Sequence, residues 1–151
     1  MKLLIGGSSS KIFHLKEFAD ALEKLQIETK VVFDADYSDG YPSRKILNWF
    51  QNDEKFKKLI SEFKPDVIFV DRQRHFGLSA IKFKIPLLMH VRGDFWKEME
   101  MARKTLYKSF PKRVALKKWN KIADECFKNS ELILPICDYL KKRTNEEYPN
   151  K

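Results

Sequence analysis

The chain has 151 residues, 43% of them hydrophobic and 13% aromatic, with a formal net charge of +9, and this predicts one globular domain, residues 1–151, with an acidic partner. Its two cysteines, Cys126 and Cys137, are too few for a disulfide framework and lack metal-ligand spacing, so we expect a reducing, intracellular setting and no metal site. The apolar runs are too short for a signal peptide or a membrane span, which leaves only peripheral membrane contact.

Short apolar runs alternate with helical patterns in the first half of the chain. In order, we predict a strand at 2–5, a helix that begins near Ile12 and runs to Leu25, a strand at 29–33, a polar loop at 34–43, a helix whose apolar face spans 56–63, and a strand at 67–70. Asn52 or Asp53 is placed to cap the second helix, and the run Lys64-Pro65-Asp66 ends it.

The alternation continues in the second half. We predict a helix at 76–84, a strand at 86–91, a helical stretch from Phe95 that Pro111 interrupts, a further helix with the apolar stripe Ala115, Trp119, Ile122 and Cys126, a strand at 132–134, and a helix at 138–148. The strands lack the alternation of a half-exposed sheet, so they indicate a mainly parallel central sheet with helices on both faces. The predicted fold is an α/β, Rossmann-like doubly wound sandwich. Receiver-like and flavodoxin-like domains share the pattern, but neither an acidic phosphoacceptor cluster nor a flavin loop is evident.

Ligands of an open parallel sheet bind beyond the carboxyl ends of its strands. After the first strand, Gly6, Gly7 and Ser8 open a glycine-rich loop whose backbone N–H groups can hold an anion at the following helix N-terminus. The loop matches neither the dinucleotide fingerprint nor a Walker A loop, and a plain turn into a helix is the alternative. Asp34, after the second strand, is expected to cap a turn or helix.

Charged residues follow the third and fourth strands. Asp71, Arg72 and His75 come after the third, and Arg92-Gly93-Asp94 comes after the fourth. A charged pair around a glycine at the end of a buried strand is costly unless it has a use. The arginine can contact a phosphate through two N–H groups, and the aspartate can accept from sugar hydroxyls. The alternative is a salt bridge from Arg92 to Asp94 or Asp71.

Five segments spread along the chain form a recognisable series. They are KLLIGG at 2–7, KPDVIFV at 64–70, GLSA at 77–80, IPLLMHVRG at 85–93 and SELILPICDYL at 130–140. In this order and spacing the series resembles the N-terminal domain of GT4-type retaining glycosyltransferases, whose GT-B architecture has two facing Rossmann-like domains. That family commonly carries a histidine before the glycine of the strand-four segment, where this chain has Arg92.

The resemblance implies that the chain is the acceptor-side half of such an enzyme. A C-terminal domain or a partner subunit would bind most of the nucleotide-sugar donor, so we expect this domain to be inactive alone and to use no other cofactor. The acceptor would be a glycan or a lipid-linked molecule. We assign Arg92 and Asp94 to catalysis, mainly by stabilising the leaving phosphate, and substrate binding to Gly6, Gly7, Ser8, Asp71, Arg72, His75 and Gly93.

The segment 101–121 contains eight Lys or Arg residues and no Asp or Glu. Tyr107, Phe110 and Trp119 are interleaved with them, a composition suited to an anionic membrane surface, where each Lys or Arg contributes about 1 kcal/mol. We predict that the chain is cytoplasmic and contacts the inner face of the membrane through Arg103, Lys104, Lys108, Lys112, Arg113 and Lys117. The alternative is the solvated face of two helices.

Two further functional classes are alternatives to the glycosyltransferase hypothesis. A non-catalytic α/β interaction module or membrane-surface binding module would have the same composition and would bind no sugar donor. Nucleic acid is not an expected partner, because the basic composition comes with no recognisable nucleic-acid-binding motif.

Overall fold

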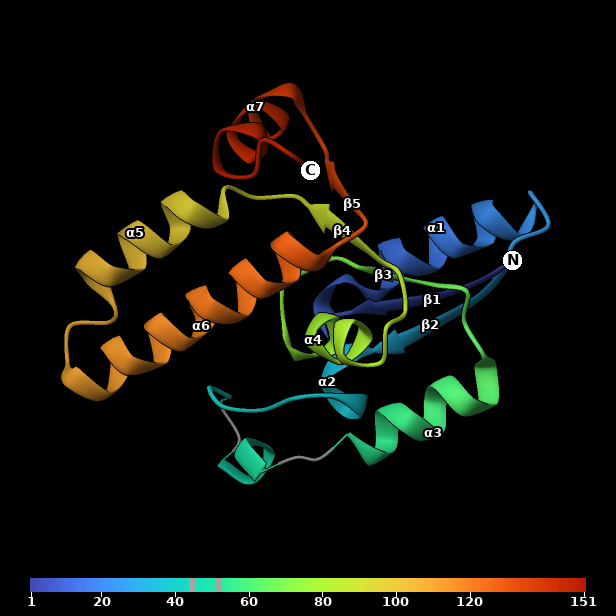
Figure 1. The fold of residues 1–151 in the computed structure, drawn as a ribbon, viewed down its shortest axis with the longest axis horizontal. Helices are drawn as coiled ribbons and strands as arrows, with labels where there is room; N and C mark the ends of the chain where they lie inside the picture. The colour runs from blue at the N-terminus through green and yellow to red at the C-terminus, as the bar shows by residue number, and fades with distance from the viewer. Residues whose placement is uncertain (44–45, 51–52) are drawn as a thin grey trace.

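Five parallel strands form one sheet with helices on both faces, as Figure 1 shows. The computed structural model describes residues 1–43, 46–50 and 53–151. The strands are β1 (Lys2–Gly7), β2 (Glu28–Phe33), β3 (Val67–Val70), β4 (Leu87–Val91) and β5 (Leu132–Pro135). The predicted α/β class and the doubly wound, Rossmann-like architecture are confirmed, and every strand pair in the described residues is parallel.

The strand order is β2-β1-β3-β4-β5, so the direction of winding reverses between β1 and β3. Doubly wound sheets bind ligands at such a reversal, because the loops after the two central strands turn to opposite faces and leave a crevice. Gly6 of β1 pairs with Val70 of β3, and Val70 pairs with Met89 of β4. The carboxyl ends of these three strands therefore meet at one edge. Flavodoxin-type folds share this order, which fixes the architecture and leaves the chemistry open.

The helical segments connect the strands in the expected places. They are η1 (Ser9–Lys11), α1 (Ile12–Glu23), α2 (Asp34–Tyr37), η2 (Ile46–Phe50), α3 (Glu54–Phe63), α4 (His75–Lys82), α5 (Phe95–Thr105), α6 (Phe110–Asn129) and α7 (Asp138–Glu147). The segment predicted as a polar loop at 34–43 begins with the helical turn α2. The break in the long helical stretch lies at 106–109, and Pro111 stands in the first turn of α6, where its missing N–H costs no hydrogen bond.

The two faces of the sheet have cores of unequal size. On the larger side, Phe56 of α3, Phe76 of α4 and Phe127 of α6 are fully buried, and the rings of Phe56 and Phe76 meet edge to face with centroids 5.0 Å apart. On the other side, α1 packs Leu15 and Ala19 against a smaller core. Burial of these large aromatic side chains stabilises the larger core and fixes α4 and α6 beside the ends of β3 and β4.

The start of α3 differs from the expected cap. Asp53 stands at the N-cap position, but its side chain makes no capping hydrogen bond. It accepts a hydrogen bond from Ser79 Oγ at 3.2 Å and binds Lys82 Nζ, both on α4. Asn52, the other predicted cap, lies outside the described residues. The Asp53 carboxylate therefore binds side chains of α4 and does not cap α3.

The glycines at the end of β1 are packing positions. A Cβ on Gly6 would lie 2.6 Å from the ring of Phe76, and a Cβ on Gly7 would lie 2.1 Å from Leu15 Cδ1. Both neighbours are buried, one in each core. The glycines therefore let α4 and α1 approach the end of β1 closely from opposite faces.

We expect Gly7→Ala to destabilise the protein by about 1–3 kcal/mol, because the added methyl overpacks the buried side chain of Leu15. Gly93→Ala is the matched control, since its Cβ would meet only Glu98 Oε1, at 2.8 Å, on an exposed and flexible side chain. We expect that control to change the free energy of unfolding by less than about 0.5 kcal/mol. Urea unfolding of both variants tests this, and equal stability of the two would contradict the packing role of Gly7.

Candidate functional site

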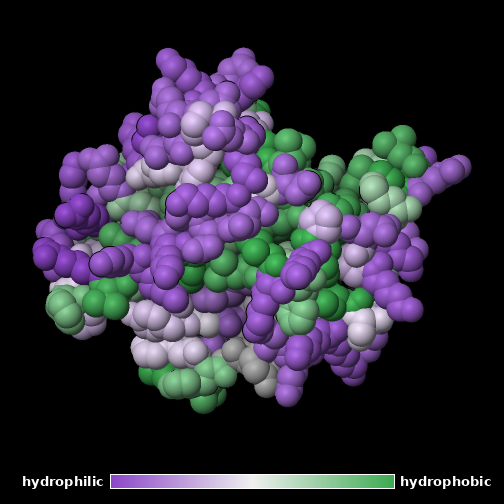
Figure 2. All heavy atoms as spheres, viewed as in Figure 1, coloured by the Kyte–Doolittle hydropathy of each residue, from purple (hydrophilic) through white to green (hydrophobic). Residues whose placement is uncertain are grey.

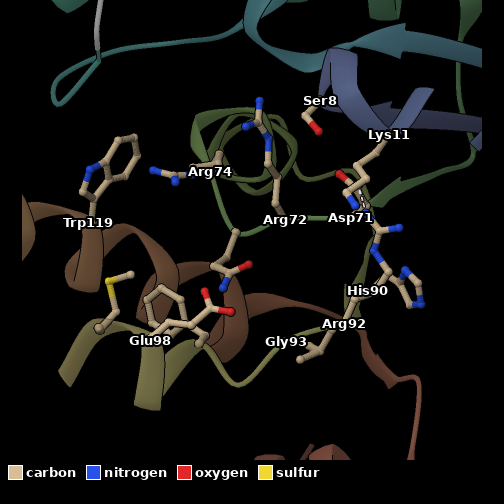
Figure 3. A pocket seen from close by; sticks show the side chains of 14 residues that line it. Ser8, Lys11, Asp71, Arg72, Arg74, His90, Arg92, Gly93, Glu98 and Trp119 are labelled. Atoms are coloured by element: carbon tan, nitrogen blue, oxygen red, sulfur yellow. Dashed lines mark hydrogen bonds and ion pairs between the residues drawn. The ribbon is translucent and has the colours of Figure 1, made fainter. Parts of the chain in front are cut away.

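A cleft of about 430 Å³ opens beyond the carboxyl ends of β1, β3 and β4. It lies at the edge where the strand order reverses, and helices α5 and α6 close it on the side away from the sheet. Figure 3 shows its two ends, with Lys11, Asp71, His90 and Arg92 at one and Arg74 and Trp119 at the other. The cleft therefore occupies the position at which the fold predicts a ligand.

Arg72, in the loop after β3, is held by Asp34 from the end of β2. Its Nε donates to Asp34 Oδ2 at 2.6 Å and its Nη2 donates to Asp34 Oδ1 at 2.5 Å. This two-pronged contact is the strong form of an arginine–carboxylate pair. The expectation that Asp34 caps a turn was incomplete, because its Oδ1 accepts from the Ala35 N–H while the carboxylate also neutralises Arg72.

Arg92, after β4, is paired with Asp71, the first residue after β3. Arg92 Nη2 donates to Asp71 Oδ2 at 2.6 Å, and the Asp71 side chain is only 2% exposed whereas that of Arg92 is 27% exposed. Burial raises the pKa of Asp71 above its usual range, against the opposing charge of Arg92. One of the two salt bridges left open by the sequence is thus present, and the Arg92 side chain still lines the cleft.

Five of the residues predicted to form the site come together in the cleft, namely Ser8, Asp71, Arg72, Arg92 and Gly93. Gly6 and Gly7 are buried and do not line the cleft; because they have no side chain, α4 and α1 can pack closely against β1. The loop that they open therefore contributes to the lining through Ser8 and Lys11.

The side chains of Asp94 and His75 make hydrogen bonds outside the cleft. Asp94 is the N-cap of α5, where its carboxylate accepts from the Lys97 N–H at 2.9 Å and from Tyr139 Oη at 2.5 Å. His75 contacts the carbonyl oxygen of Tyr41 at 3.2 Å, and burial lowers its pKa. Neither is among the cleft-lining residues of the described chain. The catalytic role of Asp94 and the substrate-binding role of His75 therefore stay predictions, and both side chains hydrogen-bond to groups outside the cleft lining.

Several lining residues were missed by sequence reasoning. Lys11, Gln73, Arg74 and Phe95 lie within three residues of predicted site residues, so proximity in sequence was a signal for them. Glu98 and Met99 sit on α5 with no signal in their spacing, and Trp119 sits on α6 within the stripe predicted to be apolar. His90 also lines the cleft, and its buried Nδ1 has no hydrogen-bond partner in the described residues. Burial, followed by the charge of Arg92, lowers the pKa of His90, which favours a neutral imidazole.

Glu98 lines the cleft beyond the end of β4, where we predicted that Asp94 would lie. Its Oε1 comes within 2.8 Å of where a Cβ on Gly93 would stand, so the absence of a side chain at Gly93 lets the carboxylate approach the end of β4. The other carboxylate of the lining, Asp71, is engaged by Arg92. Within the described residues Glu98 makes no ion pair, so it is the carboxylate that a ligand hydroxyl can reach.

The opposite end of the cleft is formed by a stacked pair. The guanidinium carbon of Arg74 lies 3.5 Å from the centroid of the Trp119 ring. Burial and the neighbouring charge of Arg72 lower the pKa of Arg74 to about 10, so the side chain remains cationic at neutral pH. With Arg72 and Arg92, it makes the lining rich in arginine and suited to an anionic ligand. No cluster of three metal-ligating side chains occurs in the part of the chain that the structure describes.

We expect Arg92→Gln to lower the free energy of unfolding by about 2 kcal/mol at pH 7, because a buried carboxylate loses its ion pair. We also expect the variant to raise the pKa of Asp71 further, because the charge of Arg92 lowers it. A carboxyl whose folded pKa is raised favours folding below its unfolded pKa and loses that contribution as the pH rises. The difference from wild type should therefore shrink as the pH falls through the pKa of Asp71.

Urea unfolding at pH 7, 5.5 and 4 measures this difference. Lys104→Gln is the control, because Lys104 pairs with Glu100 on an exposed helix surface, and such pairs contribute no more than about 1 kcal/mol. A difference between Arg92→Gln and wild type that stays constant over this pH range would contradict the role of the Arg92–Asp71 pair.

No protein-family model matches the chain, and no curated protein matches it. The fold and the arginine-rich cleft are therefore the observations from which its function is inferred.

Proposed function

We propose that this chain is the acceptor-side domain of a glycosyltransferase. The observation that supports this most directly is the placement of Arg72, Arg74 and Arg92 around a cleft beyond the carboxyl edge of the parallel sheet. Guanidinium groups bind phosphate through paired N–H bonds, and a nucleotide-sugar releases a nucleoside diphosphate. Most of the donor would be bound by another domain or subunit, and the acceptor, a glycan or a lipid-linked molecule, would lie in this cleft. The nucleotide-sugar is a substrate, and the proposal needs no cofactor.

In the proposed reaction the sugar moves from the diphosphate to an acceptor hydroxyl. Negative charge develops on the departing diphosphate, and the guanidinium of Arg92 faces the cleft to stabilise it. Asp71 positions that guanidinium through the 2.6 Å contact. Glu98 would accept a hydrogen bond from the acceptor hydroxyl, orient its oxygen toward the sugar, and take up the hydroxyl proton as the bond to the sugar forms and the bond from the sugar to the diphosphate breaks. Asp94 has no part in this scheme, because its carboxylate caps α5.

Sugar transfer in extracts of the source cells tests the proposal with whatever partner the chain has there. We expect deletion of the chain to abolish transfer of one sugar from a panel of UDP- and GDP-sugars, Arg92→Ala to reduce it by about 100- to 1,000-fold, and Glu98→Gln by about 100-fold. The control is Glu131→Gln, on an exposed side chain outside the cleft, with unchanged transfer. Undiminished transfer of every sugar after deletion would overturn the proposal in favour of a non-catalytic binding module.

A second candidate function, docking on an anionic membrane surface, is favoured by the turn between α5 and α6. Leu106 is 67% exposed and Phe110 is 81% exposed there, and Figure 2 shows hydrophobic side chains uncovered at this end of the molecule. The residues predicted to face the membrane are all exposed, namely Arg103, Lys104, Lys108, Lys112, Arg113 and Lys117. Trp119 is turned toward Arg74 and so does not belong to this surface. No described helix is both long and apolar enough to cross a bilayer.

Binding to vesicles tests this second function. We expect tighter binding to vesicles that contain an anionic phospholipid than to neutral ones, and a loss of about 100-fold when Lys108, Lys112 and Arg113 are replaced by Gln, since each cation contributes about 1 kcal/mol at low salt. The matched control replaces Lys55, Lys57 and Lys58 of α3 by Gln, which removes the same charge from another exposed helix. An equal loss in both triple variants, or no preference for anionic lipid, would contradict docking by the α5–α6 turn.

A further inference from the structure

Arg74 differs from the other two arginines of the cleft in having no carboxylate partner. Arg72 is bound by Asp34 and Arg92 by Asp71, whereas the Arg74 guanidinium lies flat on Trp119 and donates no hydrogen bond to any described residue. The guanidinium carbon stands 3.5 Å from the ring centroid, a separation at which a guanidinium stacks on an aromatic face. The in-plane N–H groups of Arg74 remain available, and they have the fork geometry that matches two oxygens of an oxyanion.

The charges around Arg74 favour an anion at this place. Four cations line the cleft, Lys11 and the three arginines, and two of them are neutralised by Asp34 and Asp71. Glu98 is the remaining carboxylate of the lining. Desolvation and the proximity of Arg72 both destabilise the charged form of Arg74, which lowers its pKa to about 10. A bound anion would relieve both effects.

We propose that the ligand of the cleft carries a phosphomonoester, and that Arg74, held by Trp119, is the residue that binds it. The inference rests on the proposed function only in taking this cleft as the acceptor site. A phosphomonoester carries about −1.5 to −2 charge at neutral pH and three acceptor oxygens, so two oxygens can accept from Arg74 while the third faces the rest of the cleft. A carboxylate offers a single charge and two oxygens, and leaves the repulsion between Arg72 and Arg74 less well compensated.

Trp119 has a positioning role in this site. Stacking fixes the plane of the guanidinium, so less side-chain freedom is lost when the anion binds. The ring of His75 also contacts the Trp119 indole, in an edge-to-face arrangement with the ring centroids 5.8 Å apart. In this site His75, which we predict from the sequence to bind substrate, would act through its contact with the Trp119 indole.

The phosphate can come from a soluble molecule or from a lipid headgroup, and fluorine NMR distinguishes the two. The protein is labelled with fluorotryptophan, and the Trp119 signal is assigned through Trp119→Phe. Inorganic phosphate, glycerol 3-phosphate, acetate at equal ionic strength, and vesicles with or without phosphatidic acid are titrated in turn. We expect a saturable shift of the Trp119 signal with phosphate and glycerol 3-phosphate. A tighter response to phosphatidic acid vesicles would assign the phosphate to a lipid, and a tighter response to glycerol 3-phosphate would assign it to a soluble acceptor.

Substitution of Arg74 identifies the binding group. We expect Arg74→Gln to weaken phosphate binding by at least about tenfold, as for the loss of a charge-assisted hydrogen bond, and Arg74→Lys to fall between that variant and wild type because it keeps the charge and loses the fork. Arg143→Gln is the matched control, since Arg143 also lies over an indole, that of Trp96 at 5.6 Å, outside the cleft. An unchanged Trp49 signal shows that each variant is folded; the Trp96 signal serves the same purpose in the Arg74 variants, because Arg143 lies over Trp96.

Three results would overturn the inference: no shift of Trp119 with phosphate, equal affinity for acetate, or equal phosphate affinity in Arg74→Gln and wild type. Phosphate binding that depends on Arg74, in a protein whose deletion leaves sugar transfer intact, would uphold this inference while defeating the proposed function. Sugar transfer that requires the chain but survives Arg74→Gln at full rate, without a phosphate-induced shift, would defeat the inference alone.

Discussion

Two buried carboxylates hold the guanidinium groups that shape the cleft. Asp34 and Asp71 stand at the ends of β2 and β3, and they bind Arg72 and Arg92 at 2.5–2.6 Å. Removing such groups from water costs several kcal/mol per ion unless the charges are paired. The pairs therefore lock the arginines into defined positions before any ligand arrives, which is the preorganisation that electrostatic binding and catalysis require.

The pairing has a consequence for the third arginine. Because Arg72 and Arg92 are already neutralised, the lining carries its uncompensated positive charge mainly on Arg74 and Lys11. Arg74 keeps its place through dispersion and cation–π attraction to Trp119, which does not consume its hydrogen-bond donors. The cleft thus contains two arginines, Arg72 and Arg92, whose charges are paired with carboxylates, and a third, Arg74, that is held in place but keeps its hydrogen-bond donors free.

Helices α5 and α6 connect the cleft with the basic turn. Met99 and Trp119 lie on their cleft side, and the exposed side chains of Leu106 and Phe110 lie at their joined ends. A ligand with a phosphate and an apolar portion would find charge at the sheet edge and apolar side chains along these helices. The proposed acceptor site and the proposed membrane surface are therefore compatible uses of the same pair of helices.

The sequence by itself determined the fold class and the edge of the sheet at which the cleft lies. The runs at 2–5 and 67–70 and the helical periodicity between them are local patterns, and parallel strands place their carboxyl ends together whatever the loops contain. It could not determine which charges pair. Asp94 is adjacent to Arg92's glycine yet caps α5, while Asp71, 21 residues away, takes the ion pair. Glu98 and Trp119 reach the cleft only because Phe95 and Phe127 pack α5 and α6 against the sheet. Hydrogen-bond partners and cleft walls depend on contacts between distant segments, and those contacts are set by tertiary packing.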